Sequence, residues 1–169
     1  ADAVINLTGK SVNGRYTAKN KKENLESRIS STLALGAAVI MAAKPPRIWI
    51  NSSSATFYRH AEDRPQDEYT GETGKDFSMG VCKQWEETFF DIPTLGTRKV
   101  ALRTALVLGK HGGVYPVFRK LANFGLAGKQ GNGRQMTSWI HEEDFIASID
   151  FIMASPELDG AINITAPHP

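Results

Sequence analysis

Short apolar runs alternate with longer amphipathic segments along the chain. The apolar runs, rich in Val, Ile and Leu, lie at 4–7, 47–50, 100–108 and 161–164. Segments with helical spacing of their apolar positions lie at about 18–43, 75–90, 114–122 and 142–154. Strands without a polar face that alternate with helices are typical of βαβ units. The pattern therefore predicts an α/β fold, a parallel sheet with helices on both faces.

Two helical segments indicate how they pack. Four large apolar residues recur at four-residue spacing in the segment 75–90 and predict one apolar face. They are Phe77, Val81, Trp85 and Phe89. The segment 18–43 begins with charged residues, but its second part, 33–41, is apolar enough to predict burial on most sides.

Polar residues follow three of the predicted strands directly. In parallel α/β sheets, ligands bind beyond the carboxyl ends of the strands, so we expect chemistry at 6–9, 52–58 and 103–113. The hydroxyls of Ser52, Ser53 and Ser54 have two interpretations. They cap a turn by accepting from backbone donors, or they are presented at the strand end to polarise a substrate carbonyl or hydroxyl.

Composition narrows the class of protein. The chain has 169 residues, 41% of them hydrophobic and 22% charged, with a formal net charge of +2. This size suits a single domain, and the small net charge argues against nucleic-acid coating or polybasic membrane binding. The single Cys82 cannot close an intrachain disulfide, and the longest apolar run is shorter than the roughly 20 residues of a membrane span. We therefore expect a cytoplasmic protein with neither a nucleic acid nor a membrane as partner.

Charge is unevenly distributed. The segment 92–141 contains several Lys and Arg residues but no Asp or Glu. The charged residues of the segment 60–91, by contrast, are predominantly acidic. A basic half of this kind suits an anionic small ligand such as a nucleotide. Chance depletion on a solvated face accounts for the pattern equally well.

Common ligand motifs are missing. The sequence has no Gly-x-Gly-x-x-Gly turn, no P-loop and no His-Glu-x-x-His. Its four histidines are scattered without nearby carboxylates at ligand spacing, so no metal site is expected.

Several segments resemble, in order, those of extended short-chain dehydrogenases/reductases, especially sugar-nucleotide epimerases. These segments are 51–58 (Asn-Ser-Ser-Ser-Ala-Thr-Phe-Tyr), 6–9 (Asn-Leu-Thr-Gly), 102–109 and 128–144. Shorter pieces at 82–86, 112–113, 124–126 and 138–141 resemble the nucleoside-diphosphate-sugar epimerase subfamily of the short-chain dehydrogenase/reductase 39U type. The resemblance covers nearly the whole chain, and the order and spacing of the pieces make it specific.

The resemblance implies an incomplete Rossmann-like sheet that starts at about the fourth strand, without the N-terminal Gly-rich βαβ unit. Residues 1–169 would then be a partial NAD(P)-binding domain that includes part of the substrate-binding region at about 110–140. The cofactor would be NAD or NADP, with NADP slightly favoured, and the fragment alone would bind it weakly. A nucleotide sugar or a carbonyl compound is the implied substrate, and a homodimer is one possible assembly.

The resemblance also implies site residues. Those implied to bind the cofactor are Asn6, Leu7, Thr8, Gly9, Ser52, Ser53 and Arg103. Those implied to bind substrate are Arg134 and His141. The alternatives are salt bridges for Arg103 and Arg134, and capping of the helix that begins at Glu142 for His141.

The sequence departs from the family at the catalytic pair Tyr-x-x-x-Lys. None of its four tyrosines is followed by Lys four residues later. We predict that Ser54 polarises the substrate oxygen and that Tyr58 handles the proton, with Arg103 or Arg59 nearby to stabilise its phenolate. Cys82 is another candidate, although a lone thiol on an apolar helical face is more often packing.

Two functions follow from these observations. The first is an NAD(P)-dependent nucleotide-sugar epimerase or carbonyl oxidoreductase. The second is a non-catalytic dinucleotide-binding or scaffold module that has the fold without the catalytic pair.

Overall fold

The computed structural model describes residues 1–129, 131–133 and 135–168. Its main sheet consists of β1 (Ala3–Asn6), β2 (Ile48–Ser54), β3 (Arg98–Thr104) and β6 (Gly160–Ile164), in the order β1-β2-β3-β6. Every neighbouring pair is parallel. The expected parallel α/β sheet is therefore confirmed, and β2 continues beyond its predicted end through the serine segment.

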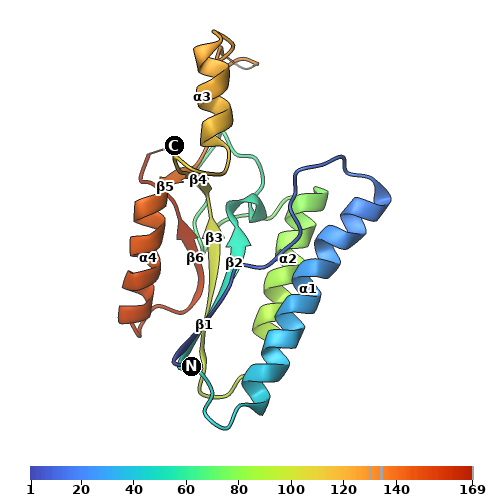
Figure 1. Ribbon diagram of the computed structural model, residues 1–169, viewed down its shortest axis with the longest axis vertical. Helices are drawn as coiled ribbons and strands as arrows, with labels where there is room; N and C mark the ends of the chain where they lie inside the picture. Colours follow the sequence, from blue (N-terminus) through green and yellow to red (C-terminus); the bar gives the residue numbers. More distant parts are fainter. Residues whose placement is uncertain (130, 134, 169) are drawn as a thin grey trace.

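Helices cover both faces of this sheet (Figure 1). On one face lie α1 (Ala18–Met41) and α2 (Phe77–Asp91), and on the other lies α4 (Glu142–Ala154). Strand side chains alternate between the two faces, so Trp49 packs with Phe89 of α2, whereas Ile50 packs with Ile152 of α4. The Trp49 and Phe89 rings meet edge to face with centroids 4.8 Å apart. The prediction of helices on both faces is confirmed.

Helices α1 and α2 pack closely. The indole Nε1 of Trp85 donates to Thr32 Oγ1 at 2.9 Å, and both residues are buried. A Cβ on Gly36 would lie 2.6 Å from Ile92 Cδ1, so this contact requires the missing side chain. The apolar face predicted for α2 is confirmed, because Val81, Trp85 and Phe89 are buried.

The expectation that the second part of α1 is buried on most sides is wrong. Leu33, Ile40 and Met41 are exposed, and the buried positions of the helix form a narrow stripe. These positions are Asn24, Thr32, Gly36 and Val39. The physical reason is that α1 lies against α2 along one side only, which leaves its outer side in solvent.

The apolar run 100–108 forms two strands in two sheets. The chain leaves β3 at Ala105 and continues as β4 (Leu106–Leu108), which pairs in parallel with β5 (Trp139–His141). Strand β5 was not predicted, because three residues next to a helix carry no readable alternation.

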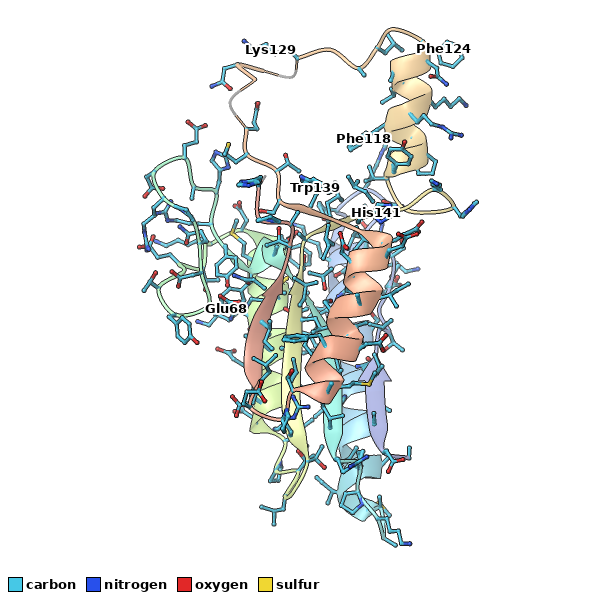
Figure 2. The ribbon with its side chains drawn as sticks, turned by 90° about the vertical axis from the view of Figure 1, so that its left-hand side faces the viewer. Glu68, Phe118, Phe124, Lys129, Trp139 and His141 are labelled. Carbon is cyan, nitrogen blue, oxygen red and sulfur yellow. The ribbon has the colours of Figure 1, made fainter. Side chains whose placement is uncertain are left out.

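Between β4 and β5 the chain projects from the end of the sheet (Figures 1 and 2). Helix α3 (Tyr115–Asn123) lies in this projection, which contains Phe118, Phe124 and Lys129. It coincides with the segment at about 110–140 to which the resemblance gives part of the substrate-binding region, and that role stays a prediction. Among the described residues, no helix is long and apolar enough to cross a membrane.

Candidate functional site

A cavity of about 390 Å³ lies at the carboxyl ends of β1 and β2, beside the N-terminal parts of α1 and α2. Its lining residues come from the loop after β1, from α1, from the serine segment and from α2. They are Leu7, Thr8, Gly9, Val12, Tyr16, Asn24, Arg28, Ser52, Ser53, Ser54, Thr56, Phe77, Ser78, Val81, Cys82 and Trp85. The cavity therefore lies where parallel α/β sheets bind their ligands.

Buried asparagines hold the loop after β1 against the cavity. Asn6 is 1% exposed, and its Nδ2 donates to Asn51 Oδ1 at 2.6 Å, which links the ends of β1 and β2. Asn6 Oδ1 in turn accepts from the backbone N of Thr8 at 3.1 Å and from its hydroxyl at 2.7 Å. Asn6 thus lies behind the wall and shapes the turn, while Leu7, Thr8 and Gly9 line the cavity.

The three serines have different surroundings. All three line the cavity, and Ser54 Oγ also caps the short 3₁₀ turn Ala55–Phe57 by accepting from Thr56 N at 3.2 Å. Ser53 is buried, and its hydroxyl donates to Glu86 Oε1 at 2.5 Å. Ser54 therefore both caps the turn and lines the cavity.

Glu86 also forms a buried ion pair. Its carboxylate accepts from Arg103 Nε at 3.0 Å and from Arg103 Nη2 at 2.8 Å. Burial disfavours a charged guanidinium, but the hydrogen bonds to Glu86 and Tyr58 outweigh this penalty and raise the pKa of Arg103. Arg103 also stacks on the Phe57 ring, with Cζ 3.6 Å from the ring centroid. Arg103 therefore forms the salt bridge that was the alternative to cofactor binding. It is not among the residues that line the cavity.

Tyr58 lies on the far side of this ion pair. Its hydroxyl accepts from Arg103 Nη1 at 2.8 Å and donates to Asn163 Oδ1 at 2.8 Å. The expected cation is thus beside the phenol, but Tyr58 is not among the residues that line the cavity. The structure therefore does not bring Ser54 and Tyr58 together at one surface, and their catalytic roles stay predictions.

Two polar positions of α2, Ser78 and Cys82, line the cavity. Burial raises the pKa of the Cys82 thiol to about 11, with the nearby Glu86 carboxylate as a smaller contribution. The thiol is therefore neutral at physiological pH, which argues against a thiolate nucleophile here.

The sequence interpretation missed Arg28, which lines the cavity from α1. Its Nη1 donates to the backbone O and to Oδ1 of Asn24, both at 3.0 Å, one helical turn away. The available signal was a polar stripe, because Asn24, Arg28 and Thr32 recur at four-residue spacing along α1. Stripes of this kind usually face solvent, which is why the spacing alone did not indicate a site.

The remaining predicted residues lie elsewhere. Figure 2 shows His141 at the start of α4, where its Nδ1 accepts from Glu143 N at 3.3 Å and caps the helix. Arg134 lies outside the described residues.

None of the described basic residues of the segment 92–141 lines this cavity. Arg98 donates to Ile152 O at 2.9 Å and Lys99 to Ile92 O at 2.6 Å. The physical reason is that the carbonyl oxygens at the C-terminal ends of α4 and α2, where the helix dipole is negative, attract these cations. In the described part of the chain, no group of three or more His, Cys, Asp or Glu side chains could hold a metal ion.

Comparison with known proteins identifies relatives of this chain. The chain is 37% identical over 169 residues to an epimerase family protein of Mycobacterium leprae, an alignment that covers 99% of the chain and 54% of that protein. The chain thus spans about half the length of the curated relatives it matches. No protein-family model matches it.

Two solved structures share the fold over nearly the whole chain. The human epimerase family protein SDR39U1, solved with NADPH, superposes with a TM-score of 0.92 and 29% identity, covering 99% of this chain and 57% of that one. The nucleoside-diphosphate sugar epimerase from Corynebacterium glutamicum superposes with a TM-score of 0.84 and 28% identity, covering 100% of this chain and 35% of that one.

The resemblance to extended short-chain dehydrogenases/reductases of the 39U type is thereby confirmed. The homologues of this chain are epimerase family proteins, and its fold is the Rossmann-like α/β fold of their solved relatives.

Proposed function

We propose that this chain forms the catalytic side of an NAD(P)-dependent nucleotide-sugar epimerase or carbonyl oxidoreductase. The observation that carries the proposal is the cavity at the carboxyl ends of β1 and β2, into which the serine segment and the Leu7–Gly9 turn both face. Relatives solved with NADPH and with NAD support a dinucleotide as cofactor, and the NADPH-bound human protein favours NADP.

The cavity residues suit a dinucleotide. Its volume lies within the range of about 300–1,000 Å³ of small-molecule sites, and its described lining contains no Asp or Glu. Gly9 also lets the backbone lie close to Arg28, because a Cβ at this position would be only 3.2 Å from Arg28 Cζ. Leu7, Thr8, Gly9 and Ser52 would hold the cofactor, which when bound supplies hydride chemistry.

Ser54 is the residue to which the proposal gives the substrate oxygen. Its hydroxyl lies on the cavity wall and donates to Thr56 Oγ1 at 3.0 Å, a neutral acceptor from which it can turn to a ligand. Beside it, Ser53 is bonded to Glu86, and the buried Asn6 links the ends of β1 and β2. Tyr58 takes part in proton transfer only if its hydroxyl leaves Arg103 and Asn163, so the proposal rests on Ser54.

The test uses the full-length protein, because the chain spans about half of its relatives. NADPH and NADH oxidation are measured against a panel of carbonyl compounds and nucleotide sugars. Substrate-dependent turnover that falls about 100-fold or more in Ser54→Ala supports the proposal. Ser148→Ala is the matched control, because that hydroxyl donates to Phe145 O within α4, on the opposite face of the sheet.

A second candidate, a dinucleotide-binding module without turnover, is favoured by the neutral Cys82 and by the engagement of the Tyr58 hydroxyl. Tight cofactor binding with no turnover on any member of the panel would select it over the enzyme.

A further inference from the structure

Arg28 is the only charged residue among those that line the cavity in the described part of the chain. The remaining lining residues are neutral hydroxyls, amides, aromatic and aliphatic groups, and the Cys82 thiol, which burial keeps protonated at physiological pH. The wall therefore carries one positive charge.

The guanidinium is held by neutral acceptors and has donors to spare. Nη1 donates to Asn24 O, to Asn24 Oδ1 and, at 3.2 Å, to Lys10 O. Among the described residues, no carboxylate lies within ion-pair distance of Arg28, and neither Nε nor Nη2 makes a hydrogen bond to the protein. This differs from Arg103, whose Nε and Nη2 are both bound by Glu86.

The placement of Arg28 is supported from two sides. Its Cζ lies 5.2 Å from the centre of the Trp85 ring, and a Cβ on Gly9 would lie 3.2 Å from it, so the backbone of Gly9 is also close. Asn24, which is 5% exposed, ties the guanidinium to its own helix. A planar group held in this way is preorganised for a planar or tetrahedral anion, because little side-chain entropy remains to be lost on binding.

A half-buried cation without a counter-ion is an unfavourable arrangement in the free protein. Burial removes water from the guanidinium and lowers the pKa of Arg28. An anionic oxygen pair in the cavity would restore the lost solvation and form charge-assisted hydrogen bonds with Nε and Nη2.

We propose that Arg28 is the anion-binding residue of this cavity and that the small molecule it accepts presents carboxylate or phosphate oxygens to it. The inference rests on the proposed function, in that the cavity is taken as the ligand site, and it adds the charge of the ligand. Ser78, whose hydroxyl lies 3.5 Å from Tyr16 Oη, adds neutral polar groups to the same wall.

The test is an NMR titration of the full-length protein, because the chain spans about half the length of its relatives. Inorganic pyrophosphate represents the phosphate oxygens of a cofactor, pyruvate a substrate carboxylate, and acetone the neutral analogue of pyruvate. A saturable shift of the Arg28 Nε–Hε signal and of the Gly9 amide with either anion, and none with acetone, supports the proposal. The anion that saturates at the lower concentration identifies the source, and the absence of a saturable shift with both anions overturns the proposal.

Variants identify the residue. We expect Arg28→Met to weaken binding of the preferred anion by at least about tenfold, measured on the Gly9 amide, and Arg28→Lys to weaken it less. Arg47→Met is the matched control, since Arg47 is exposed, precedes β2 at the end of the strand away from the cavity, and does not line the cavity. Equal affinities in Arg28→Met and in the unaltered chain would overturn the assignment.

A further measurement needs no variant, in case Arg28→Met does not fold. The full-length protein is treated with phenylglyoxal, and modified arginine peptides are measured by mass spectrometry. Protection of Arg28 but not Arg47 by saturating anion supports the proposal, and identical modification rates of Arg28 with and without anion overturn it. None of these readouts requires turnover, so an enzyme that depends on Ser54 but has a cavity indifferent to anions would contradict this inference alone.

Discussion

Glu86 of α2 and Arg103 of β3 form a buried two-point ion pair in which Arg103 Nε and Nη2 lie 3.0 and 2.8 Å from the two carboxylate oxygens of Glu86. Both side chains are less than 10% exposed. Arg103 is aligned with Ser53 of β2 and with Asn163 of β6 in the parallel register, so these three residues form one row across the sheet. It connects the serine segment at the cavity to Tyr58 behind it.

Breaking this pair is expected to destabilise the fold strongly. Arg103→Met leaves the Glu86 carboxylate buried without its cation, which costs about 3–5 kcal/mol of unfolding free energy. We expect the double variant Glu86→Leu/Arg103→Met to recover most of this loss, because it leaves no unpaired buried charge. Urea unfolding of the single and double variants measures both effects, and an Arg103→Met protein within about 1 kcal/mol of the parent would contradict the prediction.

Because of Cys82, the free energy of unfolding is expected to decrease at alkaline pH. Burial raises the pKa of its thiol from 9.0 to about 11, so the folded protein favours the neutral thiol while the unfolded chain ionises first. The stabilisation is therefore complete below about pH 9 and is lost as pH rises toward 11, by about 2–3 kcal/mol. Melting temperatures between these pH values should fall more in the parent than in Cys82→Ala. Parallel pH profiles for the two proteins would show that the thiol contributes nothing.

The hydrogen bond between Trp85 and Thr32 is expected to hold α1 against α2. Thr32→Val keeps the shape of the side chain but leaves the buried indole N–H without an acceptor, which costs about 1–3 kcal/mol. Thr88→Val is the matched control, because the Thr88 hydroxyl only donates to Gln84 O within α2. Unfolding followed by tryptophan fluorescence compares them, and an equal loss in the two variants would argue against a special role for the interhelical bond.

Acid is expected to loosen the loop between Tyr58 and Thr73, which form an isolated antiparallel bridge. Hydrogen bonds from Arg59 hold the pKa of Asp63 and that of Glu72 below their usual ranges. The groups therefore stabilise the loop above the carboxylate pKa of the unfolded chain, about pH 4, and the stabilisation is lost as pH falls further.

Amide signals of this loop should weaken on acidification before those of β2 and β3 do. Glu72→Gln should show the same change already at neutral pH, because it removes the negative charge that pairs with both Arg59 and Arg64. The control is Glu157→Gln, which lies outside the loop, and simultaneous loss of loop and sheet signals would contradict a local effect.

Local sequence patterns were sufficient to predict most of the helices and strands, because the formation of each depends on residues that are close together in the chain. The helix from Glu142 to Ala154 has the bounds that its apolar spacing and its capping residue predict. The position of the serines at a strand end followed from the buried run before them. The burial of Ser53 could not be predicted from the sequence, because it depends on which neighbouring helix brings a carboxylate to the strand.

The sequence by itself determined the alternation of strands and helices, the parallel sheet, and a polar segment at the end of β2. These are consequences of hydrophobic period and chain direction, which act over a few residues. Only the tertiary structure decided that Arg28 of α1 lines the same cavity as Ser54, and that Arg103 binds Glu86 and holds Tyr58 outside it. Both outcomes depend on the register of the strands and on the contact between α1 and α2, which join residues far apart in the chain.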